Sequence, residues 1–250
     1  MSSTDSGHLE ATVALLRRAE EEFAPRITFA CSFGAEDIVL LDLIRRHAPR
    51  ISIFTLDTGR LFPETYALID RCRDFFGLPI RVLFPDATEV EAMVAQQGVD
   101  GFYRSVEARK RCCAVRKLAP LRRALEGMAA WVTGVRREQS DQRAVMEAVE
   151  EDARFGLRKY NPLIDWTSEQ VWAHIRTNDL PYNPLHDRFY PSIGCAPCTR
   201  AVTVGEDPRS GRWWWERDEA VAECGLHVSE IRKGRGAEWA EEDDDERSGA

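Results

Sequence analysis

The sequence lacks any long apolar run and any targeting segment at its start. No stretch of the 250 residues approaches the roughly 18 apolar residues that a membrane-spanning helix needs. Residues 1–5 lack the basic and apolar regions of a secretion signal. We therefore expect a cytoplasmic protein with no membrane partner.

A closed disulfide framework and a Walker-type phosphate loop are also absent. Seven cysteines cannot all be paired, and disulfides are rare in a reducing compartment. No Gly-Lys-Ser or Gly-Lys-Thr triplet is present, which excludes the Walker loop. The cysteines therefore need an explanation other than disulfide bonding.

The composition is typical of globular proteins, at 44% hydrophobic and 30% charged residues, but the charge is unevenly distributed along the sequence. The formal net charge is −8, but residues 238–250 alone hold seven acidic residues and one arginine. So dense a run of like charge is usually solvated, and we assign residues 237–250 to a disordered acidic tail. Residues 104–123 hold eight basic residues and one acidic residue. Because stacking aromatic residues do not interleave this segment, a compact anionic ligand or cluster fits it better than nucleic acid.

Short apolar runs alternate with helix-like segments from residue 27 to residue 135, after an amphipathic first helix over 9–23. The expected strands cover 27–31, 51–56, 80–84 and 130–135, and the expected intervening helices cover 35–48, 63–76, 88–97 and 104–123. This alternation predicts an α/β fold, with a parallel sheet flanked by helices. An N-cap signal at 166–169 predicts a further helix to about residue 180, and the five prolines from 181 to 208 predict a loop-rich C-terminal segment.

Three expected strands lead into polar, glycine-containing segments, at 32–37, 56–65 and 133–140. Ligands bind beyond the carboxyl ends of parallel strands, where helix N-termini favour anions. The adjacent Arg136 and Arg137 favour a phosphate or sulfate group. Each segment alone is equally typical of an ordinary turn or a charged surface. Their convergence on one edge of the sheet indicates a nucleotide site.

Four cysteines form two close pairs, Cys112-Cys113 and Cys195-Ala196-Pro197-Cys198, with 81 residues between them. Two pairs of thiolates favour one metal centre. Adjacent cysteines point in different directions on a helix, which suits a polymetallic cluster better than a single zinc ion. Structural zinc is the alternative, and a Cys-x-x-Cys redox pair is a weaker rival because it leaves the first pair unexplained.

The other three cysteines are isolated. Cys224 is followed by glycine and, three residues on, by His227, an arrangement that fits either a reactive thiol or an inert residue. Cys31 and Cys72 fall on a strand pattern and a helix pattern, and we expect both in the core.

From about residue 27 to residue 234 the sequence resembles the assimilatory adenylyl-sulfate (APS) and phosphoadenylyl-sulfate (PAPS) reductase family. The motifs that carry the resemblance are Ser32-Phe33-Gly34-Ala35-Glu36-Asp37, Leu56-Asp57-Thr58-Gly59, Cys112-Cys113-Ala114-Val115-Arg116-Lys117, Cys195-Ala196-Pro197-Cys198 and Glu223-Cys224-Gly225-Leu226-His227. The resemblance implies a PP-loop-like (adenine nucleotide alpha hydrolase-like) fold whose Ser-Gly-Gly-x-Asp loop is altered here. It also implies a single domain over 1–236, with a nucleotide-binding core at 27–160 and a cluster-completing, catalytic segment at 161–236.

The resemblance further implies an activity, namely thioredoxin-dependent reduction of APS to sulfite and AMP in sulfate assimilation and cysteine biosynthesis. Family members with both cysteine pairs use APS, so APS is favoured over PAPS, which remains the alternative substrate. The alternative to an enzyme is a binding protein, namely a zinc-stabilised module that binds nucleotides or nucleic acid. We expect no nucleic-acid partner. Because no second Cys-x-x-Cys domain follows, we expect a separate thioredoxin as the electron donor. The sequence is also compatible with a homo-oligomer.

Residue roles follow from the resemblance as well. A [4Fe–4S] cluster would be held by Cys112, Cys113, Cys195 and Cys198, and Cys224 would form the S-sulfo intermediate. The residues expected to bind substrate are Ser32, Gly34, Asp37, Leu56, Thr58, Gly59, Lys117, Arg136, Arg137, Arg209, Arg212 and His227.

Overall fold

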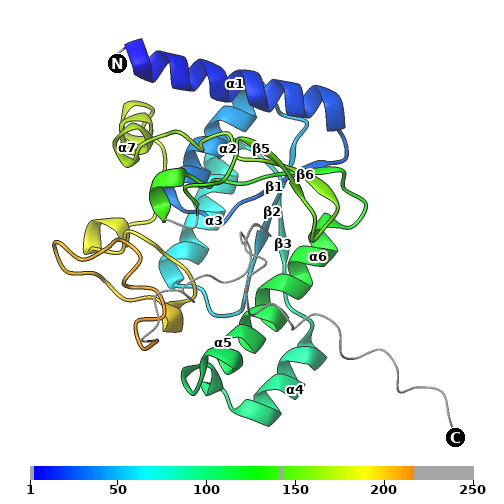
Figure 1. Cartoon of the computed structure of the whole chain (residues 1–250), viewed down its shortest axis with the longest axis vertical. Coiled ribbons are helices and arrows are strands. Elements are labelled where there is room, and N and C mark those ends of the chain that lie inside the picture. Colours follow the sequence, from blue (N-terminus) through cyan, green and yellow to red (C-terminus); the bar gives the residue numbers. More distant parts are fainter. Residues whose placement is uncertain (1–2, 141–142, 217–250) are drawn as a thin grey trace, which may run out of the picture.

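The computed structural model describes residues 3–140 and 143–216 and contains one sheet of six strands (Figure 1). The strands are β1 (Ile27–Ala30), β2 (Ser52–Leu56), β3 (Ile80–Leu83), β4 (Ala130–Val132), β5 (Val149–Asp152) and β6 (Leu157–Tyr160). Their order is β3-β2-β1-β4-β6-β5, and every pairing is parallel except that of β5 with β6. In the centre of the sheet, Phe29 lies opposite both Ile53 and Val132. The predicted parallel α/β sheet is confirmed.

Seven α-helices are present in the described part of the chain. They are α1 (Ser3–Phe23), α2 (Ala35–His47), α3 (Pro63–Phe76), α4 (Ala87–Gln97), α5 (Val106–Cys113), α6 (Ala119–Leu125) and α7 (Ser168–Thr177). Each expected helix is confirmed, except that the single helix expected at 104–123 is divided. A π-helical turn, Ala114–Leu118, separates α5 from α6.

Local sequence signals explain where the helices start and stop. Pro63 opens α3, and Gly77 ends it with a φ of 63°, in the left-handed region that favours glycine. The Thr167 side chain accepts a hydrogen bond from the Gln170 amide, and the Gln170 side chain accepts one in return. This reciprocal capping box fixes the start of α7 at the predicted position.

Helices cover both faces of the sheet. One face packs against α1, α2, α3 and α7 through apolar residues such as Leu16, Ile38 and Ile175, all at most 1% exposed. The other face packs against α6, where Leu121 and Leu125 meet Trp131 and Phe54. Successive strand residues point to opposite faces of the sheet, so Ile53 packs in the first of these cores and Phe54 in the second. Cys31 and Cys72 are both buried and free, as expected.

The hairpin of β5 and β6 is absent from our prediction. Strand β5 reads Val149-Glu150-Glu151-Asp152 and lacks the apolar alternation that marks a strand. It pairs through charge, because Glu150 lies opposite Lys159 and their side chains form an ion pair of 2.7 Å. A polar strand can occupy the edge of a sheet, where one side needs no partner.

The segment from 178 to 216 is mostly loop, as predicted, with short three-ten turns at His186–Arg188 and Ala196–Cys198. It packs beside the start of α3, where Asn183 donates to the Thr65 hydroxyl and Arg188 pairs with Glu64. None of the described helices is long and apolar enough to cross a bilayer. The domain limits at 1–236 stay a prediction, and residues 217–250 lie outside the described residues.

Candidate functional site

The two cysteine pairs meet in one cavity beside the loop that follows the carboxyl end of β2. All four thiols, Cys112, Cys113, Cys195 and Cys198, line it. The first pair ends α5, and the second lies on the three-ten turn of the C-terminal segment. Residues separated by 81 positions in the chain are therefore brought to one point, as the pairing of the motifs predicted.

The π-helical turn follows directly after the adjacent cysteines. A π-turn closes its hydrogen bond over one more residue than an α-turn, so it rotates the following residues relative to an α-helix. Arg116 and Lys117 in this turn line the same cavity as the cysteines. Two thiols and two cations of this segment therefore face the same cavity.

A loop after β2 holds the second cysteine pair in place. Ala196 N donates to Arg60 O at 2.8 Å, and the Thr58 hydroxyl lies 3.2 Å from the Cys195 sulfur. The Arg116 guanidinium donates to Thr58 O at 2.7 Å, which connects the π-helical turn to the same loop. Gly59 has a φ of 71°, a conformation that favours glycine. The Leu56-Asp57-Thr58-Gly59 motif therefore lies at the cysteine cavity.

Three N–H groups around this cavity are buried and have no hydrogen-bond acceptor. They are Arg116 Nε, Arg212 Nε and Trp213 Nε1. Buried donors are nearly always paired in native structures, so an electron-rich group held by the cysteines would meet free donors at this cavity. Sulfide or thiolate sulfur of an iron–sulfur cluster would accept from them.

Among residues 3–140 and 143–216, no three His, Cys, Asp or Glu side chains are grouped as ligands of a single metal ion. A cluster takes one thiolate on each of its irons, and four cysteines are available around the shared cavity. The choice between a cluster and a structural zinc ion stays a prediction.

Burial raises the pKa of the Cys198 thiol to about 12, with the neighbouring Cys195 adding to the rise and Lys117 and Arg212 opposing it. Burial raises the pKa of Cys112 as well, against the effect of Arg116. Protonated thiols do not bind metal, so a metal centre here forms with the release of protons. The surrounding cations lower the energy of the resulting thiolates.

The loop after β1 is held by a buried carboxylate. Both the amide and the hydroxyl of Ser32 donate to Asp37, at 2.5 and 2.6 Å, and Ser32 itself is exposed. Gly34 is the residue before α2. A side chain at Gly134, in the loop after β4, would place its Cβ about 2.1 Å from the Asp37 carboxylate. The predicted loops at 32–37 and 133–140 therefore meet at the same sheet edge.

The two arginines expected to bind substrate are paired with carboxylates. Arg136 is 6% exposed and donates to Glu36 and Glu138 and to the Trp166 carbonyl. Arg137 forms ion pairs with Asp165 and Glu147. Both side chains brace the 133–140 loop in this structure, and their contact with substrate stays a prediction.

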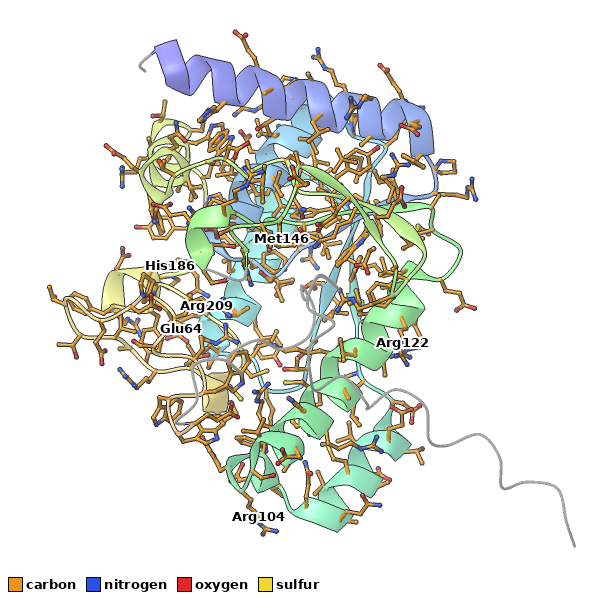
Figure 2. The ribbon with its side chains drawn as sticks, viewed as in Figure 1. Glu64, Arg104, Arg122, Met146, His186 and Arg209 are labelled. Atoms are coloured by element: carbon orange, nitrogen blue, oxygen red, sulfur yellow. The ribbon has the colours of Figure 1, made fainter. Side chains whose placement is uncertain are left out.

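The remaining expected substrate residues divide between two places. Lys117 and Arg212 line the cysteine cavity. Arg209 is half-buried in the C-terminal segment, on the flank where Figure 2 also shows His186 and Glu64, and its amide donates to Asp207. Cys224 and His227, the expected nucleophile and its neighbour, lie outside the described residues.

Sequence reasoning missed several residues that form this site. Arg60, Phe102, Arg109 and Trp213 line the cavity, and Glu216 pairs with Arg109. The run Arg212-Trp213-Trp214-Trp215-Glu216 was the available signal, because three adjacent tryptophans are costly to leave in water.

Comparison with known proteins agrees with this geometry. Residues 26–201 match the model of the phosphoadenosine phosphosulfate reductase domain. The chain is 55% identical over 221 residues to adenosine 5'-phosphosulfate reductase of Allochromatium vinosum, covering 88% of this chain and 86% of the relative. It is 49% identical over 223 residues to the protein of the same name from Burkholderia cepacia, covering 89% and 88%.

Solved structures show the same fold. Phosphoadenylyl-sulfate reductase from Candida auris superposes with a TM-score of 0.66 at 26% identity, covering 81% of this chain and 98% of that one. The FMN adenylyltransferase of Candida glabrata superposes with a TM-score of 0.59 at 14% identity, covering 92% and 82%. The second likeness concerns the fold alone.

Proposed function

The chain belongs to the phosphoadenosine phosphosulfate reductase family, and on that premise we propose that it reduces APS to sulfite and AMP with electrons from thioredoxin. The observation that carries the proposal is the single cavity that four cysteines share with Lys117 and Arg212. It lies beside the strand ends where parallel sheets bind nucleotides. Relatives about half identical over most of their length carry the name adenosine 5'-phosphosulfate reductase.

Cys112, Cys113, Cys195 and Cys198 would hold a [4Fe–4S] cluster. When bound, this group joins the two cysteine segments and adds a fixed charge beside the anionic substrate. The unpaired N–H groups of Arg116, Arg212 and Trp213 would donate to its sulfur atoms.

The reaction proceeds in two displacements at sulfur. The Cys224 thiolate attacks the sulfur of APS, an S–S bond forms, and the S–O bond to phosphate breaks. AMP leaves with the bonding electron pair, and phosphate is a good enough leaving group to need no strong acid. Lys117 and Arg212 neutralise the phosphosulfate during this step.

Thioredoxin then supplies both electrons. Its thiolate attacks the sulfur of Cys224, and sulfite leaves with the electron pair of the S–S bond. The resulting mixed disulfide is opened by the second thiol of thioredoxin, which releases Cys224 as a thiolate. We propose that this reaction takes place in the cytoplasm. A homo-oligomer stays a prediction of the sequence alone.

The test is an assay of anaerobically purified full-length protein with APS and thioredoxin, with iron counted in the same sample. We expect AMP and sulfite in equal amounts and about four irons per chain. Cys224→Ser should abolish turnover and keep the visible absorbance of the cluster, whereas Cys72→Ala, at a buried free cysteine on α3, should keep both. Full activity of Cys224→Ser would contradict the mechanism, and one zinc per chain would contradict the cluster.

Substrate choice is a separate measurement, because the family model and the Candida auris structure are named for PAPS. We expect kcat/KM to be higher for APS than for PAPS. The reverse order would make the chain a PAPS reductase with the same chemistry.

A further inference from the structure

His186 is a half-buried histidine that the proposed mechanism does not use. Its Nδ1 lies 2.9 Å from the carbonyl oxygen of Tyr190, and because a carbonyl oxygen can only accept, Nδ1 carries the proton of the neutral ring. The other ring nitrogen, Nε2, is buried and has no hydrogen-bond partner in the described part of the chain. It is therefore an unused acceptor, and buried polar atoms of this kind are rare in folded proteins.

The ring is neutral, which decides what it can bind. Burial lowers the pKa of His186, against the effects of the Glu36 carboxylate, the bond to Tyr190 and the Asp187 carboxylate. The ordinary pKa of histidine is 6.5, so the lowered value leaves the ring uncharged at neutral pH. A neutral ring attracts no phosphate or sulfate group, and its free nitrogen takes an N–H or O–H donor instead.

Contacts on several sides place this ring beside the predicted substrate loops. The Trp172 ring packs edge-on against it, with centroids 5.1 Å apart and 82° between the planes. Tyr190, which fixes Nδ1, packs edge-on against Phe62, the residue before α3. Glu36, which acts on the charge of the ring, lies in the first turn of α2. His186 therefore lies close to the points at which the loops after β1 and β2 pass into helices.

This edge of the sheet is where a parallel α/β fold binds its ligand. Figure 2 shows His186 on the same flank as Arg209, which the sequence predicts to bind substrate. The ionised phosphosulfate of APS carries only acceptor oxygens, so it cannot pair with Nε2. The donors of APS are the two ribose hydroxyls and the 6-amino group of adenine, all in its adenosine half. Nε2 therefore matches the half of the substrate that cationic residues are not suited to bind.

We propose that His186 is a substrate-binding residue, with Nε2 accepting a hydrogen bond from a ribose hydroxyl or from the adenine amino group of APS. The inference rests on the proposed function, since it takes APS as the ligand. Trp172 and Tyr190 hold the ring, so little freedom is lost when the hydrogen bond forms. Nε2 is closed to water, and the ring lies in the loop-rich segment 178–216, where a shift of side chains on binding admits the ligand. If the donor is the ribose 3′-hydroxyl, the same lone pair disfavours the 3′-phosphate of PAPS.

The test compares nucleotide binding to the full-length, anaerobically purified protein and to its His186→Asn variant by isothermal titration calorimetry. The asparagine amide nitrogen takes the place of Nδ1 and can keep the bond to Tyr190, but nothing replaces Nε2. The ligands are AMP and three analogues that each lack one donor, namely 2′-deoxy-AMP, 3′-deoxy-AMP and purine riboside 5′-monophosphate. We expect AMP to bind the variant about fivefold more weakly than the wild type, which is the effect of one lost hydrogen bond.

One analogue identifies the donor. The analogue that lacks the group bound by Nε2 should bind His186→Asn and the wild type equally, whereas the other two should lose about fivefold, as AMP does. In turnover of APS the KM of the variant should rise by about the same factor. Its kcat should change little, because the contact is equally strong before and during the reaction.

His47→Asn is the matched control, because it makes the same substitution at the far end of α2, whose first turn holds Glu36. It should bind AMP as the wild type does. His186→Gln, whose longer side chain can place its oxygen near the position of Nε2, should recover most of the affinity. His186→Phe keeps a ring against Trp172, and it repeats the analogue comparison if His186→Asn folds poorly.

Two outcomes would overturn the inference, namely wild-type affinity of His186→Asn for AMP, or an equal loss of affinity for AMP and all three analogues, which a general disturbance of the loop would cause. Failure of the proposed function looks different. In that case the wild-type chain itself would bind no AMP and release no sulfite from APS.

Discussion

At the scale of single residues, the contact between Asp37 and the loop of Ser32 places a carboxylate where it is costly to ionise. Burial raises the pKa of Asp37 to about 7, with Glu36 adding to the rise, although the two hydrogen bonds from Ser32 and the charge of Arg143 oppose it. The absence of a side chain at Gly134 makes room for this carboxylate, because a Cβ there would collide with it. The loop expected to bind the nucleotide is therefore held by a group that titrates near neutral pH.

This shift makes a prediction about stability. Below the ordinary pKa of 3.8, Asp37 is protonated in both the folded and unfolded states. Between that value and about 7, the folded state keeps a proton that the unfolded state has lost, so the free energy of unfolding falls as pH rises. Asp37→Asn, which stays neutral, should lose less stability than the wild type from about pH 5 to about pH 8.

Thermal melts of both proteins across this range provide the measurement. Asp70→Asn serves as the control, because it removes a carboxylate by the same substitution from a side chain that is 71% exposed. Parallel profiles for the wild type and Asp37→Asn would show that the carboxylate is not protonated in the folded state.

At the scale of elements, the π-helical turn Ala114–Leu118 sets the rotation of Arg116 and Lys117 relative to the adjacent cysteines. Without it, α5 and α6 would form one continuous α-helix, and Lys117 would be rotated relative to Cys112 and Cys113. Deletion of Ala114 should convert the turn to α-helix. We expect the protein to fold, with an unchanged far-UV circular dichroism spectrum, and to hold much less of the iron of the proposed cluster than the wild type.

Thr167→Ala is the control for this deletion. It removes the N-cap of α7, far along the chain from the cysteines, and should destabilise the protein by about 1 kcal/mol while its iron content stays the same. Full iron content in the Ala114 deletion would show that the π-turn does not position the ligands.

At the scale of the whole molecule, the cysteine centre joins the α/β body to a segment with little regular structure of its own. The segment from 178 to 216 relies on contacts such as Arg188 with Glu64 and Arg109 with Glu216, and on the meeting of the cysteines. A cluster at this point would stabilise the folded state by its own binding free energy.

Removal of the second cysteine pair, in Cys195→Ala/Cys198→Ala, should therefore loosen the C-terminal segment more than the sheet. We expect a lower Tm and faster amide exchange between 178 and 216, while β1 and β4 stay protected because their apolar core is intact. Equal loss of protection throughout the chain would show that the centre and the sheet form a single cooperative unit.

The sequence by itself determined the features that depend on local pattern. Short apolar runs indicated the parallel strands, apolar residues at helical spacing indicated the helices, and the capping signal at Thr167 marked the start of α7. The spacing of Cys112-Cys113 and Cys195-x-x-Cys198 was enough to predict that the two pairs lie close together, because two pairs of thiolates supply the four ligands of one metal centre.

Only the tertiary structure decided which charges pair with one another. Arg136 and Arg137 looked like ligands for an anion, and they lie against carboxylates from distant segments. Arg109 looked like one base among eight, and it is buried against Glu216. The polar strand β5 likewise depends on a partner strand for its structure. An ion pair depends on the distance between two side chains in space, and sequence pattern fixes that distance only within a single element.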